Sequence, residues 1–204
     1  MPSLPLATHD PDAIAAALRG RGACRLASFP GHVATRSLGD DLRRLQAAGA
    51  MQAASVGHGG DRRLRADIRG DTTLWLDDAR CGEAAGVYLA MLDALRAELN
   101  RQLFLGMQEV EAHYACYPPG ASYRRHRDRF RDSDARILSL VTYLNDDWLP
   151  EHGGALRLHL PGGPVDVLPQ AGTSVLFLSE LEHEVLPAAR ERLSIAAWLR
   201  RHGA

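Results

Sequence analysis

The spacing of the apolar positions changes once along the chain, near residue 108. Before that point, apolar residues recur every three or four positions, which is the period of a helix with one buried face. After it, they form short runs that Gly and Pro residues separate, which is typical of strands joined by turns. The sequence therefore predicts helices in the first half and a sheet in the second.

Three helices are predicted in the first half. The first covers about 10–18, with Asp10 as its cap and Pro11 in its first turn, and a short strand at 23–29 follows it. The second covers about 32–48 and the third about 83–104. Their apolar faces are predicted to contain Val33, Leu38, Leu42 and Leu45 in the second helix, and Val87, Met91, Leu92, Leu95 and Leu99 in the third.

The second half is predicted to form many short strands. They cover about 109–117, 135–145, 155–160, 164–168, 174–178 and 192–200. This pattern favours an antiparallel sandwich or jelly roll, and helices that precede it in the chain favour an α+β fold in which they buttress one face of the sheet. We expect a single domain over 1–204, with helical support at about 10–105 and a β core at about 107–200.

Residues 55–71 are rich in Gly and Arg and have no hydrophobic period. Loops of this length are usually functional lids or disordered segments, and both interpretations remain open here.

The composition fits a globular protein with a core, since 46% of the residues are hydrophobic and 24% are charged. The net charge of -1 argues against an electrostatic attraction to nucleic acid or to an anionic membrane. The three cysteines, Cys24, Cys81 and Cys116, are widely spaced, which is typical of a reducing compartment. No secretory signal is visible. We expect a cytoplasmic protein, a monomer or weak dimer, that binds neither nucleic acid nor membrane.

The first candidate for chemistry is the tripeptide His126-Arg127-Asp128. In an extended segment, side chains two positions apart point the same way, so an imidazole and a carboxylate converge. They would supply two ligands of a 2-His-1-carboxylate triad, which holds non-haem Fe(II) and leaves positions open. His183 follows the apolar strand at 174–178 and is the candidate third ligand.

The second candidate is Arg192, at the start of the strand at 192–200. Alternation places Arg192 on the inner face, while the apolar face with Leu193 packs on the helices. A buried guanidinium needs an anion, and a ligand carboxylate satisfies it in a bidentate manner. The phenol of Tyr143 is placed to donate to the same anion.

Each feature has a simpler interpretation when taken alone. His126 and Asp128 would be a surface pair, His183 a hydrogen-bonded core histidine, and Arg192 the partner of Glu191 or Glu184. The arginine run at 124–131 would be a nucleic-acid patch, although the net charge favours a solvated rim or a rim for an acidic substrate. The order of all these residues on a strand-rich half favours one site instead.

Several motifs in this order resemble the 2-oxoglutarate/Fe(II)-dependent dioxygenases, in particular the prolyl hydroxylase branch with the hypoxia-sensing enzymes and their bacterial relatives. The resemblance covers roughly residues 28–200. The matching stretches are Asp67-Ile68-Arg69-Gly70-Asp71 with Trp75, Ala115-Cys116-Tyr117-Pro118, Tyr123-x-x-His126-x-Asp128, Tyr143-Leu144-Asn145 with Trp148, Gly153-Gly154-x-Leu156-Arg157, and His183-Glu184-Val185. One departure is Ala196, which stands where the hypoxia-sensing relatives carry Thr.

The resemblance implies a double-stranded β-helix of the jelly-roll, cupin-like kind. It also implies roles for particular residues: Fe(II) ligation by His126, Asp128 and His183, binding of the distal carboxylate of 2-oxoglutarate by Arg192 and Tyr143, a place for Tyr117 beside this co-substrate and for Trp198 in the pocket, and a mobile substrate loop at 55–75 with Asp67, Arg69 and Trp75.

The resemblance implies the hydroxylation of a prolyl residue in a protein substrate. The reaction would use Fe(II), 2-oxoglutarate and O₂, with ascorbate as a further expected reductant, and would release succinate and CO₂. Two alternatives stay open: the same chemistry on a small molecule such as a free amino acid, and a non-catalytic metal-dependent sensor or binding module.

Overall fold

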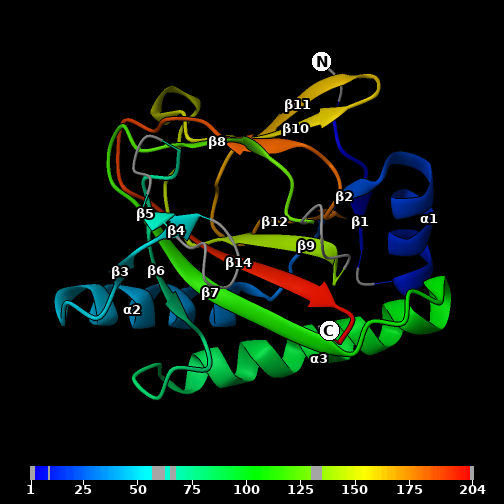
Figure 1. The fold of residues 1–204 in the computed structure, drawn as a ribbon, viewed down its shortest axis with the longest axis horizontal. Helices are drawn as coiled ribbons and strands as arrows, with labels where there is room; N and C mark the ends of the chain where they lie inside the picture. The colour runs from blue at the N-terminus through cyan, green and yellow to red at the C-terminus, as the bar shows by residue number, and fades with distance from the viewer. Residues whose placement is uncertain (1–2, 9, 57–62, 65–67, 130–134, 203–204) are drawn as a thin grey trace.

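The structure is a computed structural model that describes residues 3–8, 10–56, 63–64, 68–129 and 135–202. Two sheets lie one above the other, and helices cover the outer side of the larger sheet (Figure 1). The predicted α+β jelly roll with helical support is therefore confirmed.

The three predicted helices are present. They are α1 Pro11–Arg21, α2 His32–Ala47 and α3 Glu83–Leu103. The side chain of Asp10 caps α1 by accepting from the backbone N–H of Asp12, and Gly22 ends the helix with a left-handed φ of 72°. No helix in the described part of the chain combines the length and apolar composition needed to cross a membrane.

The larger sheet has eight strands in the order β1-β2-β12-β9-β14-β7-β6-β3. Their bounds are β1 Leu6–Ala7, β2 Ala23–Leu26, β12 Ser174–Leu178, β9 Arg136–Tyr143, β14 Arg192–Arg200, β7 Glu109–Tyr117, β6 Thr72–Trp75 and β3 Gln52–Ala53. All neighbouring pairs except β1–β2 are antiparallel. The predicted strands at 109–117, 174–178 and 192–200 are confirmed to the residue.

The smaller sheet has four strands in the order β11-β10-β13-β8. Their bounds are β11 Gly163–Val167, β10 Leu156–Leu160, β13 His183–Val185 and β8 Tyr123–His126. A third, two-stranded sheet pairs β4 Ser55–Val56 with β5 Arg63–Leu64. The expectation of an aperiodic segment without secondary structure at 55–71 is therefore wrong in part, because sequence periodicity does not detect strands of two residues.

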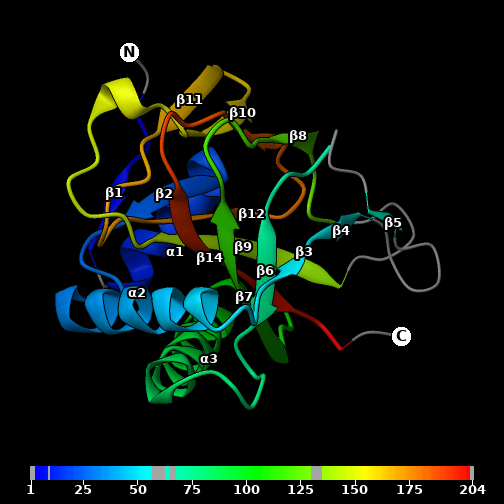
Figure 2. The ribbon, with the colours of Figure 1, turned by 90° about the vertical axis from the view of Figure 1, so that its left-hand side faces the viewer.

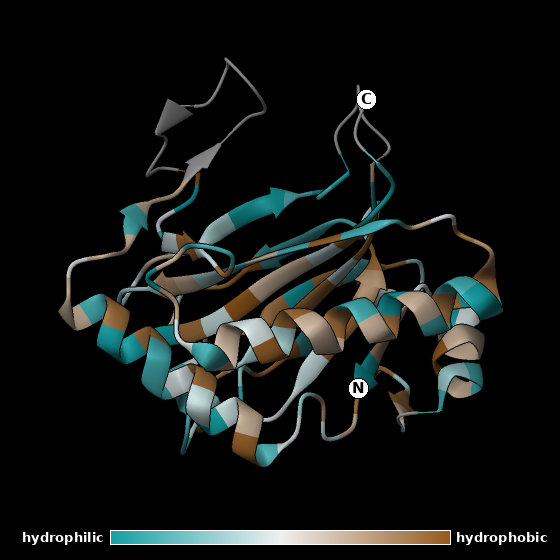
Figure 3. Cartoon of the chain, turned by 90° about the horizontal axis from the view of Figure 1, so that it is seen from below, coloured by the Kyte–Doolittle hydropathy of each residue, from teal (hydrophilic) through white to brown (hydrophobic). Residues whose placement is uncertain are grey.

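Two hydrophobic cores lie on opposite faces of the large sheet. One fills the space between this sheet and the helices and includes Leu193, Ile195 and Leu199 of β14. The other fills the jelly roll between the two sheets and includes Tyr117 and Tyr143. Figures 2 and 3 show α2 and α3 across the outer face of the large sheet, and the colours of Figure 3 show apolar and polar bands that alternate along each helix. The predicted division of β14 into a helix-facing and an inner face is confirmed.

Two residues of the predicted helix faces are exposed instead. Val33 is 80% exposed and Val87 is 50% exposed. Val33 precedes Leu38 by five residues, which places it about 140° away around α2. Val87 lies next to the buried Tyr88, about 100° away around α3. Both predictions were wrong because apolar character alone does not fix the angular position of a buried face.

The side chain of Asp41 on α2 connects this helix to α3 and to the large sheet. One carboxylate oxygen accepts from the side chain of Arg44, and the other accepts from the backbone N–H of Gly82, at the start of α3, and from the hydroxyl of Tyr114 on β7, both at 3.0 Å. This buried carboxylate therefore fixes α2, α3 and the large sheet relative to one another.

Candidate active site

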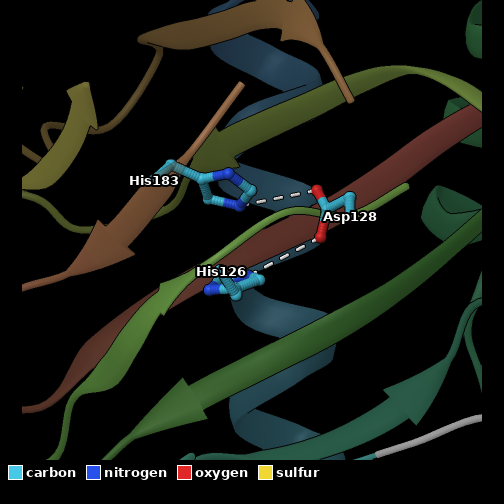
Figure 4. A group of neighbouring side chains, drawn as sticks. All are labelled: His126, Asp128 and His183. Carbon is cyan, nitrogen blue, oxygen red and sulfur yellow. Dashed lines mark ion pairs between the residues drawn. The ribbon is translucent and has the colours of Figure 1, made fainter. Parts of the chain in front are cut away.

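The small sheet brings the two histidines together. His126 is the last residue of β8 and His183 the first of β13, and the antiparallel register places them directly opposite each other. Their ring centroids lie 4.2 Å apart. Asp128 follows His126 by two residues, just beyond β8, and its carboxylate points between the two rings (Figure 4).

The three side chains present ligand atoms to one point. His126 Nε2 lies 3.6 Å from one carboxylate oxygen of Asp128, and His183 Nε2 lies 3.5 Å from the other. All three ligand atoms lie within 4.8 Å of one another. The side chains of His126, Asp128 and His183 are 17%, 11% and 5% exposed. Arg127, between the two ligands in the chain, has a side chain that is 59% exposed, as the alternation of an extended segment requires.

Backbone carbonyls fix the orientation of both rings. Nδ1 of His126 lies 2.7 Å from the carbonyl oxygen of Arg124, and Nδ1 of His183 lies 2.9 Å from that of Leu181. A carbonyl oxygen only accepts, so each Nδ1 carries the donated proton and each Nε2 of a neutral ring presents a lone pair. Two lone pairs and a carboxylate that face one another, too far apart to hydrogen-bond, fit a divalent cation.

A pair of serines holds the carboxylate of Asp128. The hydroxyl of Ser139 on β9 donates to Asp128 Oδ2 at 2.7 Å. That hydroxyl has one proton to give, so the hydroxyl of Ser179, at 2.9 Å, donates to Ser139 in turn. The backbone N–H of Asp128 also donates to the carbonyl of Ser179. The carboxylate is therefore oriented from two directions.

The local charges keep the site ready for a metal at neutral pH. Burial would raise the pKa of Asp128, but His183 and His126 outweigh that effect and hold it well below the usual carboxyl value. Burial lowers the pKa of His183 below 6.5, although Asp128 opposes this effect. At pH 7 Asp128 is therefore ionised and His183 is neutral, which are the forms that bind metal.

Arg192 lies inside the jelly roll with 1% exposure. Its Nε donates to the carbonyl of Gly154 and its Nη1 to the hydroxyl of Ser194, both at 3.0 Å. Its Nη2 has no hydrogen-bond partner among the described residues, and the same is true of the buried hydroxyl of Tyr143. Two buried donors without a protein acceptor fit a carboxylate of a bound ligand.

The aromatic rings around Arg192 complete this pocket. Its guanidinium carbon lies 5.1 Å from the ring centre of Tyr117 and 5.2 Å from that of Tyr143. Burial raises the pKa of Tyr143 to about 12, although the nearby Arg192 opposes the shift, and burial also raises the pKa of Tyr117. Tyr143 therefore stays protonated at neutral pH and remains a hydrogen-bond donor.

Neither Glu191 nor Glu184, the two partners considered for Arg192 from the sequence, pairs with it. Glu191 accepts from the side chains of Gln46 and Cys116, and Glu184 lies 2.9 Å from His159. No acidic side chain of the described residues pairs with Arg192. Its interpretation as half of an ion pair with either glutamate is wrong.

A third group of predicted residues lies next to the metal-binding candidates. Trp198 lies directly opposite Ser139 in the sheet, and its ring lies 6.3 Å from that of Trp75. Arg69 pairs with Asp71 at 2.7 Å. Its guanidinium also lies over the ring of Tyr123, which stacks on His126 with the ring centres 3.6 Å apart. Arg69 and Trp198 thus lie next to residues that contact the metal-binding candidates, Trp75 packs on Trp198, and Asp67 lies outside the described residues.

Three serines that build the site were not singled out from the sequence: Ser139 and Ser179 hold Asp128, and Ser194 holds Arg192. For Ser139 a signal existed, because it shares a strand face with Tyr143. Tyr123, which stacks on His126, and Gly154, whose carbonyl accepts from Arg192, lie in the stretches that carry the resemblance, but they were given no role.

Comparisons with known proteins agree with this geometry. Residues 112–200 match the model of the 2OG-Fe(II) oxygenase superfamily. The matched range contains His126, Asp128, His183 and Arg192. The family is named for Fe(II), a divalent metal that the triad fits, and for 2-oxoglutarate, a dicarboxylate that the donors of the Arg192 pocket fit.

Among curated proteins, the chain is 30% identical over 210 residues to Egl nine homolog 1 of Homo sapiens, covering 97% of this chain and 47% of that protein. It is 28% identical over 186 residues to human Prolyl hydroxylase EGLN3, covering 87% and 77%. The chain thus spans about half the length of the Egl nine homologs that it matches.

Among solved structures, a Pseudomonas putida prolyl-4-hydroxylase superposes with a TM-score of 0.85 at 45% identity, over 94% of this chain and 99% of that one. A Trichoplax adhaerens prolyl hydroxylase, solved with a hypoxia-inducible-factor peptide, superposes with a TM-score of 0.80 at 28% identity, over 92% and 87%. The chain therefore belongs to the 2OG-Fe(II) oxygenase superfamily, whose members use Fe(II), 2-oxoglutarate and O₂, and it is a homologue of the prolyl hydroxylases.

Proposed function

We propose that this protein hydroxylates a prolyl residue of a protein substrate, with 2-oxoglutarate and O₂ as co-substrates and succinate and CO₂ as products. The observation that carries the proposal is the combination of a metal-ready triad with two buried donors, Arg192 Nη2 and the Tyr143 hydroxyl, for which the described part of the chain offers no acceptor. A non-catalytic metal-binding module would have no use for the second pocket.

In this proposal, His126, Asp128 and His183 hold Fe(II), and Arg192 and Tyr143 hold the distal carboxylate of 2-oxoglutarate. When bound, Fe(II) and 2-oxoglutarate together supply the activation of O₂ that inserts an oxygen atom into a C–H bond. The chain supplies the geometry. The serine pair orients Asp128, the backbone carbonyls orient both imidazoles, and Tyr117 and Trp198 help to exclude water from the pocket.

The substrate assignment rests on the relatives and on the third group of residues. The Pseudomonas putida relative, of which the chain covers 99%, is a prolyl-4-hydroxylase, and the Trichoplax adhaerens relative was solved with a peptide. We assign the substrate contact to the segment that contains Asp67, Arg69 and Trp75. Arg69 supports this role because it connects the segment to the ring that stacks on His126.

The compartment and assembly state belong to the same proposal. Cys24, Cys81 and Cys116 are all free thiols, which supports a reducing cytoplasm. We further propose a monomer or weak dimer, without a nucleic-acid or membrane partner, and ascorbate as a reductant that keeps the iron in its Fe(II) form.

Two measurements test the proposal. In an anaerobic titration of the Fe(II)-loaded protein with 2-oxoglutarate, we expect a visible charge-transfer band that His183→Ala abolishes and that Arg192→Ala shifts to higher 2-oxoglutarate concentration. In aerobic turnover with single-proline peptides, we expect peptide-stimulated succinate release and one added oxygen on the proline by mass spectrometry. Absence of the band in the wild type refutes the oxygenase, and stimulation by free amino acids alone refutes the protein substrate.

A further inference from the structure

Arg192 depends on neutral acceptors for its orientation. Its Nε donates to a backbone carbonyl, that of Gly154, and its Nη1 to a hydroxyl, that of Ser194. In the described residues no carboxylate contacts it, so no strong ion pair compensates for an error in its placement. The direction of its free Nη2 therefore depends on how firmly the backbone around Arg192 is held.

The sheet holds that backbone on one side only. On the β7 side, Arg192 lies opposite Tyr117 in regular pairing. On the β9 side, the last regular pair is Ser194 with Tyr143, where β9 ends. The backbone N–H and carbonyl of Leu193, the residue next to Arg192, therefore lie beyond the end of β9.

The side chain of Asn145 takes the place of the missing strand. Its Oδ1 accepts from the backbone N–H of Leu193 at 2.6 Å, and its Nδ2 donates to the carbonyl of Leu193 at 2.9 Å. Nδ2 also donates to the carbonyl of Pro169 at 2.8 Å. The backbone N–H of Leu144 adds one bond to the same Leu193 carbonyl, at 3.2 Å. Asn145 is 5% exposed, so water does not readily replace these bonds.

The turn that carries Gly154 is held just as closely. Gly154 has a φ of +70°, and a Cβ there would lie 2.9 Å from Ala188 Cβ and 3.4 Å from Arg192 Cδ. The indole N–H of Trp148 donates to the carbonyl of Gly153 at 3.0 Å. The carbonyl of Gly154 is thereby placed where the Nε of Arg192 meets it.

We propose that Asn145 is a positioning residue for 2-oxoglutarate: together with the Gly154 carbonyl, it fixes Arg192 beside Tyr143 so that both free donors meet one carboxylate. Asn145 connects the end of the Tyr143 strand to the start of the Arg192 strand, so it sets the separation of the two donors. The inference rests on the proposed function, in which these donors bind the distal carboxylate.

The test measures binding and not turnover. The Mn(II)-loaded protein is titrated by calorimetry with 2-oxoglutarate and, separately, with 2-oxobutyrate, which has the same 2-oxo acid end and no distal carboxylate. Asn145→Ala removes three hydrogen bonds, two of them to the backbone of Leu193, and is expected to weaken 2-oxoglutarate binding about tenfold. It is expected to leave the affinity for 2-oxobutyrate and for Mn(II) unchanged.

The chain contains a matched control. The amide of Asn100 also holds both backbone groups of one residue, accepting from the N–H of Met107 and donating to its carbonyl, at the end of α3 and away from the pocket. Asn100→Ala is expected to lower stability as Asn145→Ala does and to leave binding of both 2-oxo acids unchanged. Equal losses of 2-oxoglutarate affinity in the two variants would overturn the proposal, as would equal losses for both ligands in Asn145→Ala.

Two further variants separate the possible failures. If Asn145→Ala does not fold, Trp148→Phe tests the same pocket, because it removes the indole donor to the Gly153 carbonyl and so loosens the turn that places the Gly154 carbonyl. A loss confined to 2-oxoglutarate supports the proposal, and no change in affinity overturns it. If Arg192→Met leaves 2-oxoglutarate affinity intact, the assigned anchor itself is wrong, whatever Asn145 does.

Discussion

At the scale of single residues, the metal-binding candidates are set by hydrogen bonds that the ligands themselves do not reveal. His126 and His183 both direct Nδ1 to a carbonyl two residues earlier, and Asp128 is held by Ser139. The sequence predicted two of the ligands from the His-x-Asp spacing and the third, His183, from its place after the apolar strand at 174–178. Alternation places Ser139 on the inner strand face with Tyr143, but it does not show that Asp128 lies within reach of the Ser139 hydroxyl, because that contact joins β9 of the large sheet to the residue just beyond β8 of the small sheet.

The Ser139 hydroxyl provides the first prediction. Ser139→Ala removes the donor to Asp128 and is expected to weaken Mn(II) binding about 10- to 100-fold, as the loss of such supporting contacts usually does. Paramagnetic resonance of free Mn(II) measures the affinity. Ser174→Ala is the control, because Ser174 is equally buried but donates to the carbonyl of Phe29 on the helical side of the sheet. A similar loss of affinity in both variants would contradict a specific role for Ser139.

At the scale of secondary-structure elements, the long strands and the helices could be predicted and the short strands could not. β7 and β14 have enough residues for alternation to show, β12 is a continuous apolar run, and α1 has both of its terminal signals. β3, β4 and β5 have two residues each, so they depend on partners and not on a local pattern. The bounds of β13 likewise follow from its pairing with β10 and β8.

The attachment of the helices to the sheet provides the second prediction. Asp41→Ala removes the acceptor shared by α2, α3 and Tyr114, and is expected to lower the free energy of unfolding by about 2–3 kcal/mol. Urea unfolding followed by circular dichroism measures it. Asp40→Ala is the matched control: the neighbouring side chain of Asp40 is 70% exposed and pairs loosely with Arg43, so its loss should stay within about 0.5 kcal/mol. Equal effects of the two changes would contradict the role given to Asp41.

At the scale of the whole molecule, the predicted architecture was reached because composition, period and motif order agree. The jelly roll needs two facing sheets, and the inner face of β14 carries Arg192 while its outer face packs on the helices. What could not be predicted is the polar interior, in which Arg69, Asp71 and His113 meet from β7 and the segment before β6. Such contacts join parts of the chain that share no local pattern.

The buried His113 provides the third prediction, which concerns how the free energy of unfolding varies with pH. Burial and, to a smaller extent, the positive charge of the neighbouring Arg69 together lower the pKa of His113 to about 4. Between pH 6.5 and about 4 the unfolded chain binds a proton that the folded chain does not, so stability falls as the pH falls. The contribution is up to about 3 kcal/mol.

Urea unfolding at a series of pH values tests this prediction. His113→Gln keeps an acceptor for Arg69 and a donor for the Tyr114 carbonyl, and should flatten the stability profile between pH 6.5 and 4. If His113→Gln shows the wild-type slope, His113 is not the group responsible.

The opposition of His126 and His183 across β8 and β13 has a consequence for folding. β8 is the outermost strand of the small sheet, and a slip of one residue would turn His126 away from His183. An ion held by both histidines would therefore cross-link β8 and β13, which lie far apart in the sequence. It would bind only when these two strands are paired in the native register. The metal affinity would then depend on the correct register of β8 and β13. The same three ligands would serve the reaction and favour the native pairing of the small sheet.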